Sequence, residues 1–113
     1  MKVVHCYRDP YNTYVGRPSP FGNPFSDKKS KHPTLPVKTV GEAVAAYEAW
    51  LRRGERNLEV IKLGIYPDHR YLQRMIRALR DSAILGCYCK PGPCHGDIIK
   101  DVWMEMQAGG WPE

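Results

Sequence analysis

Proline placement is the feature that most restricts the fold of this chain. Six of the ten prolines fall between Arg8 and Lys38, in a segment that also holds Gly16 and Gly22. Proline lacks a backbone N–H and clashes with the preceding helical turn, so this segment is not helical. A loop of this length in a small protein is usually functional or disordered. Aromatic residues in its first half favour an ordered loop; they are Tyr11, Tyr14, Phe21 and Phe25.

Two short apolar segments, residues 2–7 and 83–89, have the composition of buried strands. Helical patterns separate them in the sequence. Neighbouring strands that are joined through helices pair in parallel, with a right-handed crossover. We therefore predict an α/β fold: a single domain over residues 1–113, with a small Rossmann-like sheet of parallel core strands and flanking helices.

The helices are recognised by the signals at their ends. Thr39 and Glu42 have the spacing of a capping box, and Gly54 is suited to end that helix. Asp68 can cap a further helix, and the pattern predicts a last helix from about His95.

Ligands of parallel sheets bind beyond the carboxyl ends of the strands. The first strand leads into the loop Gly16–Phe25, and the second leads into the turn Cys89–Asp97. Parallel pairing brings both segments to one edge of the sheet. We expect the working site where these two segments meet.

The turn Cys89–Asp97 precedes the last helix. Free amides and the positive dipole at a helix start favour an anion and lower the pKa of a thiol. On this interpretation Cys94 is a candidate nucleophile, His95 or Asp97 is the acid–base group, and the Gly96 amide helps to bind phosphate.

Two other interpretations of this turn stay open. Cysteine and histidine are zinc ligands, so a zinc ion could bind Cys87, Cys89, Cys94 and His95, although the spacing differs from paired CxxC motifs. A structural interpretation needs only buried cysteines, a hydrogen-bonded histidine and an acidic helix start. The leading prediction includes no metal and no cofactor.

The loop Gly16–Phe25 is stiffened by prolines and carries hydrogen-bonding side chains. Arg17 could bind phosphate through two N–H groups, and Tyr14 could stack on a base. We predict that Ser19 and Asn23 contact the sugar or base of a ligand. The alternative is a rigid loop in which Arg17 pairs with a protein carboxylate and Asn23 caps a turn.

The formal net charge of +5 suits an anionic partner. No apolar run reaches the roughly 18 residues of a membrane span, and residues 1–6 lack the apolar stretch of a signal peptide. We therefore expect a cytoplasmic protein without membrane contact, whose four cysteines are reduced thiols.

Three segments together carry a family resemblance: Tyr11–Phe25, Thr39–Leu51 and Leu85–Ile98. They resemble an uncharacterised family of phage and bacterial domains of unknown function, numbered 4326. Its pattern is YDVYIGRPSxxGNPF, a helix with YxxWL, and CWCxPxxCHGDV. The resemblance implies a phage-type protein defined by the same two loops, and it implies no activity. The chain departs mildly from the pattern at Asn12, Tyr88 and Ile98.

These observations together predict a small nucleotide-binding protein. The ligand would be a nucleotide or a nucleotide-derived small molecule, held between Gly16–Phe25 and Cys89–Asp97, with hydrolysis or modification of that ligand left open. Nucleic acid is a second candidate partner. The alternative is a zinc-stabilised module, with a cysteine-rich motif, that binds nucleic acid or a host protein.

Overall fold

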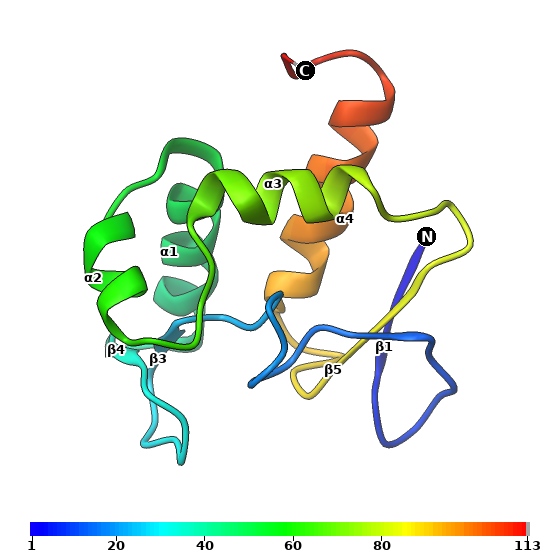
Figure 1. The fold of residues 1–113 in the computed structure, drawn as a ribbon. Coiled ribbons are helices and arrows are strands. Elements are labelled where there is room, and N and C mark those ends of the chain that lie inside the picture. Colours follow the sequence, from blue (N-terminus) through cyan, green and yellow to red (C-terminus); the bar gives the residue numbers. More distant parts are fainter. Residues whose placement is uncertain (113) are drawn as a thin grey trace.

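The computed structural model describes residues 1–112 and contains a small three-stranded sheet (Figure 1). Strand β5 (Ile84–Cys87) lies in the middle, between β1 (Lys2–His5) and β2 (Thr13–Tyr14). Both pairings are parallel. The prediction of parallel core strands joined through helices is therefore confirmed. The strands are shorter than predicted, because the chain turns directly after β1, where the amides of Arg8 and Asp9 donate to the His5 carbonyl.

Four helices complete this mixed α/β fold: α1 (Val40–Arg53), α2 (Asn57–Lys62), α3 (His69–Arg77) and α4 (His95–Gln107). Helix α4 packs on β1 and β5 and also contacts α1 and α3. Figure 1 shows α4 between the sheet and the other helices, with α3 lying across α1 and α4. The four helices and the sheet therefore share one core.

Local capping chemistry sets the helix ends. The Thr39 side chain accepts the amide hydrogen of Glu42 at 3.0 Å, as a capping box requires. The Glu42 carboxylate accepts from the Lys38 amide at 2.9 Å, one residue earlier than the motif predicts. Gly54 ends α1 with a φ of 71°, in the left-handed region that favours glycine. The Asp68 side chain caps α3 by accepting from the amide of Arg70, the second residue of the helix, at 2.8 Å.

A second pair of strands, not predicted from the sequence, closes the proline-rich segment. Strands β3 (Phe25–Ser26) and β4 (Leu35–Pro36) pair in parallel. Two further backbone bonds flank the pair, from the Leu35 amide to the Pro24 carbonyl at 2.7 Å and from the Val37 amide to Ser26 at 3.0 Å. Because β3 and β4 pair, residues 27–34 fold back over the loop that precedes them.

Large buried side chains fill the space between the sheet and the helices. The Tyr47 and Trp50 side chains of α1 are fully buried, and their rings meet edge to face with centroids 5.6 Å apart. The Tyr47 hydroxyl donates to the Phe21 carbonyl at 3.0 Å, so the core also anchors the proline-rich loop. Other fully buried members are Leu51, Leu72, Ile76, Leu85, Ile99 and Val102.

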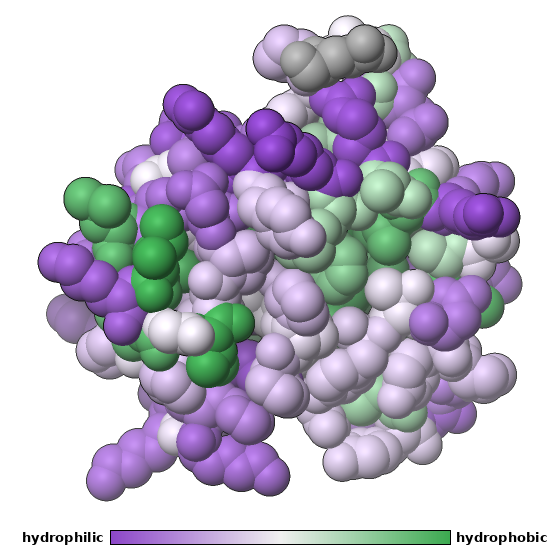
Figure 2. All heavy atoms as spheres, viewed as in Figure 1, coloured by the Kyte–Doolittle hydropathy of each residue, from purple (hydrophilic) through white to green (hydrophobic). Residues whose placement is uncertain are grey.

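The molecular surface has one notable apolar region. Leu58, Ile61 and Ile65 are exposed, and Figure 2 shows hydrophobic residues gathered where Figure 1 places α2. Within residues 1–112, no helix combines the length and the apolar composition needed to cross a membrane.

Candidate functional site

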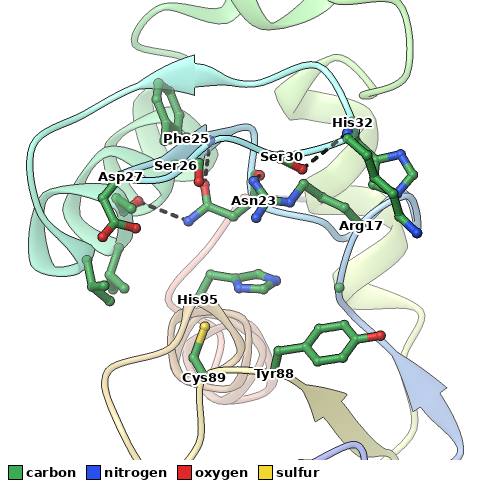
Figure 3. Close-up of a pocket in the computed structure, with 15 residues that line it drawn as sticks. Arg17, Asn23, Phe25, Ser26, Asp27, Ser30, His32, Tyr88, Cys89 and His95 are labelled. Carbon is green, nitrogen blue, oxygen red and sulfur yellow. Dashed lines mark hydrogen bonds between the residues drawn. The ribbon is translucent and has the colours of Figure 1, made fainter.

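The two predicted segments meet at the carboxyl edge of the sheet. The His95 Nε2 atom lies 2.6 Å from the Val15 carbonyl oxygen, which joins the start of α4 to the first loop. A pocket of about 290 Å³ opens beside this contact, between the first loop, residues 27–32 and the turn after β5 (Figure 3). Arg17 and His95 line the same pocket, as expected from the parallel pairing of the two core strands.

One end of this pocket is rich in cations. Arg17, Lys31 and His32 line it, and within residues 1–112 neither Arg17 nor Lys31 forms an ion pair with a carboxylate. Arg17 Nη1 donates to the backbone carbonyl of Asn23 at 3.4 Å. Asp27 also lines the pocket, but Figure 3 places it at the end opposite Arg17 and His32. The alternative in which Arg17 pairs with a protein carboxylate is therefore wrong for the part of the chain described.

His95 is buried and holds the two loops together. Its ring packs against Tyr47, with centroids 5.0 Å apart, and burial lowers the pKa of His95 to about 4. The imidazole is therefore neutral near pH 7. A carbonyl only accepts, so Nε2 carries the proton toward Val15, and Nδ1 lies 4.0 Å from the Cys94 sulfur. Both ring nitrogens face protein atoms, which gives His95 the contacts of a positioning residue; its acid–base role stays a prediction.

Three cysteines cluster at one wall of the pocket, which Cys89 lines while Cys87 and Cys94 are buried behind it. The Cys94 thiol donates to the Cys87 sulfur at 2.6 Å, and the Cys94 sulfur accepts from the Gly96 amide at 3.3 Å. Accepting this hydrogen bond lowers the pKa of Cys87 to about 6, and interaction with the Cys94 thiol lowers that of Cys89 to about 7. The Cys94 pKa is raised, because its thiol is the donor to Cys87, lies near Cys89 and is buried.

The predicted net lowering of the Cys94 pKa at the helix start is therefore wrong. The Gly96 amide does lower this pKa, but the hydrogen bonding of Cys94 with the neighbouring cysteines and its burial raise it by more. Cys94 is the N-cap residue of α4, and its sulfur faces Cys87 rather than the pocket. Cys89 is exposed and lines the pocket, so it is the thiol that a ligand would meet.

The cluster does not have the geometry of a zinc site. A tetrahedral zinc site needs four ligand atoms directed at one point. The Cys94 thiol is hydrogen-bonded to Cys87, and His95 Nε2 is directed at the Val15 carbonyl. In residues 1–112 no three or more Cys, His, Asp or Glu side chains are arranged to hold a metal ion. Thus Cys87, Cys89, Cys94 and His95 do not fit the zinc alternative.

Asp97 and Gly96 are used within the protein. The Asp97 carboxylate pairs with Lys90 Nζ at 2.6 Å and does not line the pocket. The Gly96 amide donates to Cys94, so it is not free to bind phosphate. A Cβ at Gly96 would lie 2.9 Å from a Val3 methyl, so this glycine allows α4 to approach β1. The predicted phosphate contact at Gly96 is therefore wrong for this structure.

Tyr14 and Ser19 lie outside the pocket. The Tyr14 hydroxyl donates to the Arg17 carbonyl at 3.1 Å, and Tyr14 lines an adjoining hollow instead. The Ser19 hydroxyl accepts from the Phe21 amide at 3.2 Å within a turn. The contact predicted between Ser19 and a ligand is therefore absent from the pocket as it stands.

Asn23 lines the pocket, but backbone groups occupy its amide. Its Nδ2 donates to the Ala43 carbonyl at 3.1 Å, and its Oδ1 accepts from the Phe25 amide at 2.9 Å. Figure 3 shows both bonds, of which the first joins the loop to α1 and the second closes a turn within the loop. The alternative in which Asn23 caps a turn is confirmed, and this turn fixes the pocket wall.

Sequence reasoning missed the contribution of residues 27–32. Lys31 and His32 reach the pocket because β3 pairs with β4. Strands of two residues are too short to show a recognisable pattern in the sequence. Tyr88 was noted only as a departure from the family pattern. Strand alternation could not have placed Tyr88, because β5 ends at Cys87 and both Tyr88 and Cys89, which follow it, line the pocket.

A known protein family and a phage protein are similar to this chain over most of its length. The family described as "Domain of unknown function (DUF4326)" matches residues 2–105. The chain belongs to this family. It is 29% identical over 104 residues to the "Uncharacterized 12.4 kDa protein in nrdA-td intergenic region" of Enterobacteria phage T4, a span of 89% of this chain and 75% of the relative. No solved structure matches the chain.

Proposed function

We propose that this protein of the DUF4326 family binds a nucleotide, or a ligand derived from one, between the loop Gly16–Phe25 and the turn Cys89–Asp97. The observation that carries the proposal is the basic end of the pocket, where Arg17 and Lys31 lie with His32 and form no ion pair with a carboxylate within residues 1–112. An arginine fork and a lysine are suited to a phosphate group.

The rest of the pocket supports a small ligand with both charged and uncharged parts. Its volume of about 290 Å³ is near the lower end of ligand pockets, about 300 Å³. Phe25, Val40 and Val44 give it apolar wall, and Asp27 offers a carboxylate away from the cations. A phosphate at the cationic end would therefore direct the sugar or base toward Asp27.

The fold supports the same position for the ligand. Parallel strands β1 and β5, followed respectively by the first loop and by α4, place the pocket beyond their carboxyl ends. Ligands of Rossmann-like sheets bind at this edge. We include in the proposal that this three-stranded sheet works as a reduced Rossmann-like sheet.

The proposal concerns binding. Cys94 and Asp97 do not line the pocket, and the nitrogens of His95 face protein atoms, so these three residues form no nucleophile–base pair around a ligand. Of the three clustered cysteines, Cys89 is exposed and lines the pocket, so it is the thiol in place for a covalent step.

A thermal-shift screen with nucleoside mono-, di- and triphosphates tests the proposal. A nucleotide at about 100 times its Kd should stabilise the folded protein by about 2.7 kcal/mol. Arg17→Ala should weaken the affinity about 10- to 100-fold, because it removes charged hydrogen bonds to phosphate. The matched control is Arg74→Ala, which removes an exposed arginine of α3 that lines no part of the pocket.

Three results would overturn the proposal. They are a screen in which no nucleotide stabilises the protein, an Arg17→Ala variant with unchanged affinity, and equal losses for Arg17→Ala and Arg74→Ala. The melting temperature of each variant without ligand shows whether the fold is intact.

A further inference from the structure

Four tyrosines form a cluster beside the pocket, here called the tyrosine platform: Tyr7, Tyr11, Tyr14 and Tyr88. Ring centroids of Tyr7 and Tyr88 are 5.2 Å apart, those of Tyr14 and Tyr88 are 5.9 Å apart, and those of Tyr11 and Tyr14 are 6.2 Å apart. Tyr7 is 79% exposed, Tyr88 is 50% exposed and Tyr11 is 43% exposed. The platform is therefore a connected aromatic surface that the core does not use.

The sheet determines where these rings lie. Gly86 of β5 makes room for Tyr11, because a Cβ there would lie 2.6 Å from the ring. Strand residues alternate between faces, so this ring covers the face opposite Leu85 and Cys87, which belong to the buried core. Tyr7 follows β1 as Tyr88 follows β5, and their hydroxyl oxygens lie 3.3 Å apart. Parallel pairing thus brings together tyrosines that are 81 residues apart.

The platform is continuous with the proposed nucleotide pocket. A hollow beside the pocket is lined by Tyr11, Tyr14, Arg17, Pro18, Lys31, His32 and Tyr88. Four of these residues also line the pocket itself: Arg17, Lys31, His32 and Tyr88. Figure 3 shows Arg17, His32 and Tyr88 on the same side of the pocket. Arg17, Lys31 and His32 therefore lie between the pocket and the tyrosine platform.

We infer that the ligand is single-stranded nucleic acid, with one nucleotide in the pocket and the neighbouring bases stacked on the tyrosine platform. This inference rests on the proposed function and names its substrate class. Proteins that bind single strands combine stacking aromatic side chains with cations that follow the phosphates. Arg17 and Lys31 lie where the phosphates between a pocket nucleotide and a stacked neighbour would pass.

A free mononucleotide accounts for less of this surface. It would occupy the pocket and leave Tyr7 and Tyr11, which do not line the pocket, without a role. Exposed tyrosines also occur at protein–protein contacts. The cations shared by the pocket and the hollow, together with the net charge of +5, favour a polyanion over a protein partner.

Fluorescence anisotropy at fixed, moderate ionic strength tests the inference. The probes are labelled oligothymidine and oligouridine of about ten nucleotides, competed with the matching nucleoside monophosphates and with duplex DNA. We expect the oligomers to bind at least about tenfold more tightly than the monophosphates, because each stacked base adds affinity. Preference between the two oligomers distinguishes DNA from RNA as the source of the strand.

Variants of Tyr7 separate stacking from folding, because this side chain is 79% exposed. Tyr7→Ala should weaken oligomer binding about 5- to 100-fold and leave monophosphate binding unchanged. Tyr7→Phe keeps the ring and should keep the affinity. The matched control is Tyr71→Ala, which removes a 56% exposed tyrosine from α3, away from the platform.

The outcomes separate this inference from the proposed function. If monophosphates bind in an Arg17-dependent way while oligomers bind no tighter and Tyr7→Ala has no effect, the inference is overturned and the proposed function stands. If no monophosphate or oligomer binds, both are overturned, and the platform is a candidate protein contact. If Tyr71→Ala weakens oligomer binding as much as Tyr7→Ala, stacking on the platform is contradicted.

Discussion

Arg52 in the helical layer is ion-paired within the protein, whereas Arg17 at the edge of the sheet has no ion pair within residues 1–112. Arg52 of α1 is held by both carboxylate oxygens of Glu105, at 2.7 and 2.8 Å, and by Glu48 at 2.9 Å. Arg17 instead donates to a backbone carbonyl, at 3.4 Å. The first arrangement joins α1 to α4 and stabilises the fold, and the second leaves a guanidinium available to a ligand.

Aromatic residues show the same contrast. Tyr47 and Trp50 of α1 are fully buried, and each hydrogen-bonds to a protein oxygen, at Phe21 and Asn57 respectively. Tyr7 is 79% exposed, and its hydroxyl lies beside that of another exposed tyrosine, Tyr88. Hydrophobic burial therefore explains Tyr47 and Trp50 but not the tyrosines of the sheet edge.

An unpaired cation does not by itself mark a site. Arg70 and Arg74 of α3 are exposed and form no ion pair among the described residues, yet they line none of the pockets described here. What distinguishes Arg17 is its place in a pocket with Lys31 and His32. Position in the fold therefore distinguishes Arg17 from the exposed arginines of α3, and this distinction can be tested by experiment.

His95 connects the start of α4 to the Val15 carbonyl at the sheet edge, and acidic pH should weaken this connection. Burial lowers its pKa from 6.5 to about 4, with Arg17 adding to the lowering and Asp97 opposing it. The unfolded chain therefore binds a proton that the folded protein does not, between pH 6.5 and about 4. We expect the free energy of unfolding to fall by about 3 kcal/mol across this range, as measured by urea denaturation.

His95→Asn should remove that pH dependence, and His32→Asn is the control that should keep it. The slopes of the curves are compared, since the substitution at His95 also removes a hydrogen bond. The pKa of Glu105 is lowered to about 2 by its hydrogen bond with Arg52, so its contribution is lost at lower pH. A curve for His95→Asn that keeps its slope would show that His95 is not the titrating group.

Gly86→Ala should lower the free energy of unfolding, because Tyr11 of the tyrosine platform packs directly on this glycine. The new methyl would meet the Tyr11 ring at 2.6 Å, so the ring must move, at a cost of about 1–2 kcal/mol in urea denaturation. The control Gly41→Ala lies in α1, where the nearest atom would be 3.8 Å away, and should be neutral or stabilising. Equal effects of the two substitutions would mean that Tyr11 does not depend on Gly86 for its position.

Removing each arginine compares the two regions directly. Arg52→Ala should lower the free energy of unfolding by about 1 kcal/mol, because it breaks a two-pronged ion pair that is part of a network. Arg17→Ala should change it by less than about 0.5 kcal/mol, since no carboxylate partner is lost. A larger loss for Arg17→Ala than for Arg52→Ala would show that Arg17 serves the fold.

The sequence alone predicted the features that depend on neighbouring residues. The cap at Thr39, the end of α1 at Gly54 and the cap at Asp68 all involve residues within a few positions of one another. The parallel pairing of β1 with β5 also followed from the sequence, because the intervening helices leave little other choice. That pairing in turn predicted that Arg17 and His95 would share one pocket.

Which groups face the pocket, and how they ionise, depends on contacts that form only in the folded protein. Lys31 reaches it through the pairing of β3 with β4, and Cys94 is turned from it toward Cys87. Tyr7 and Tyr88 meet across 81 residues of sequence. Burial, pKa and exposure depend on atoms brought together from distant parts of the chain, and the residues adjacent to each group do not specify them.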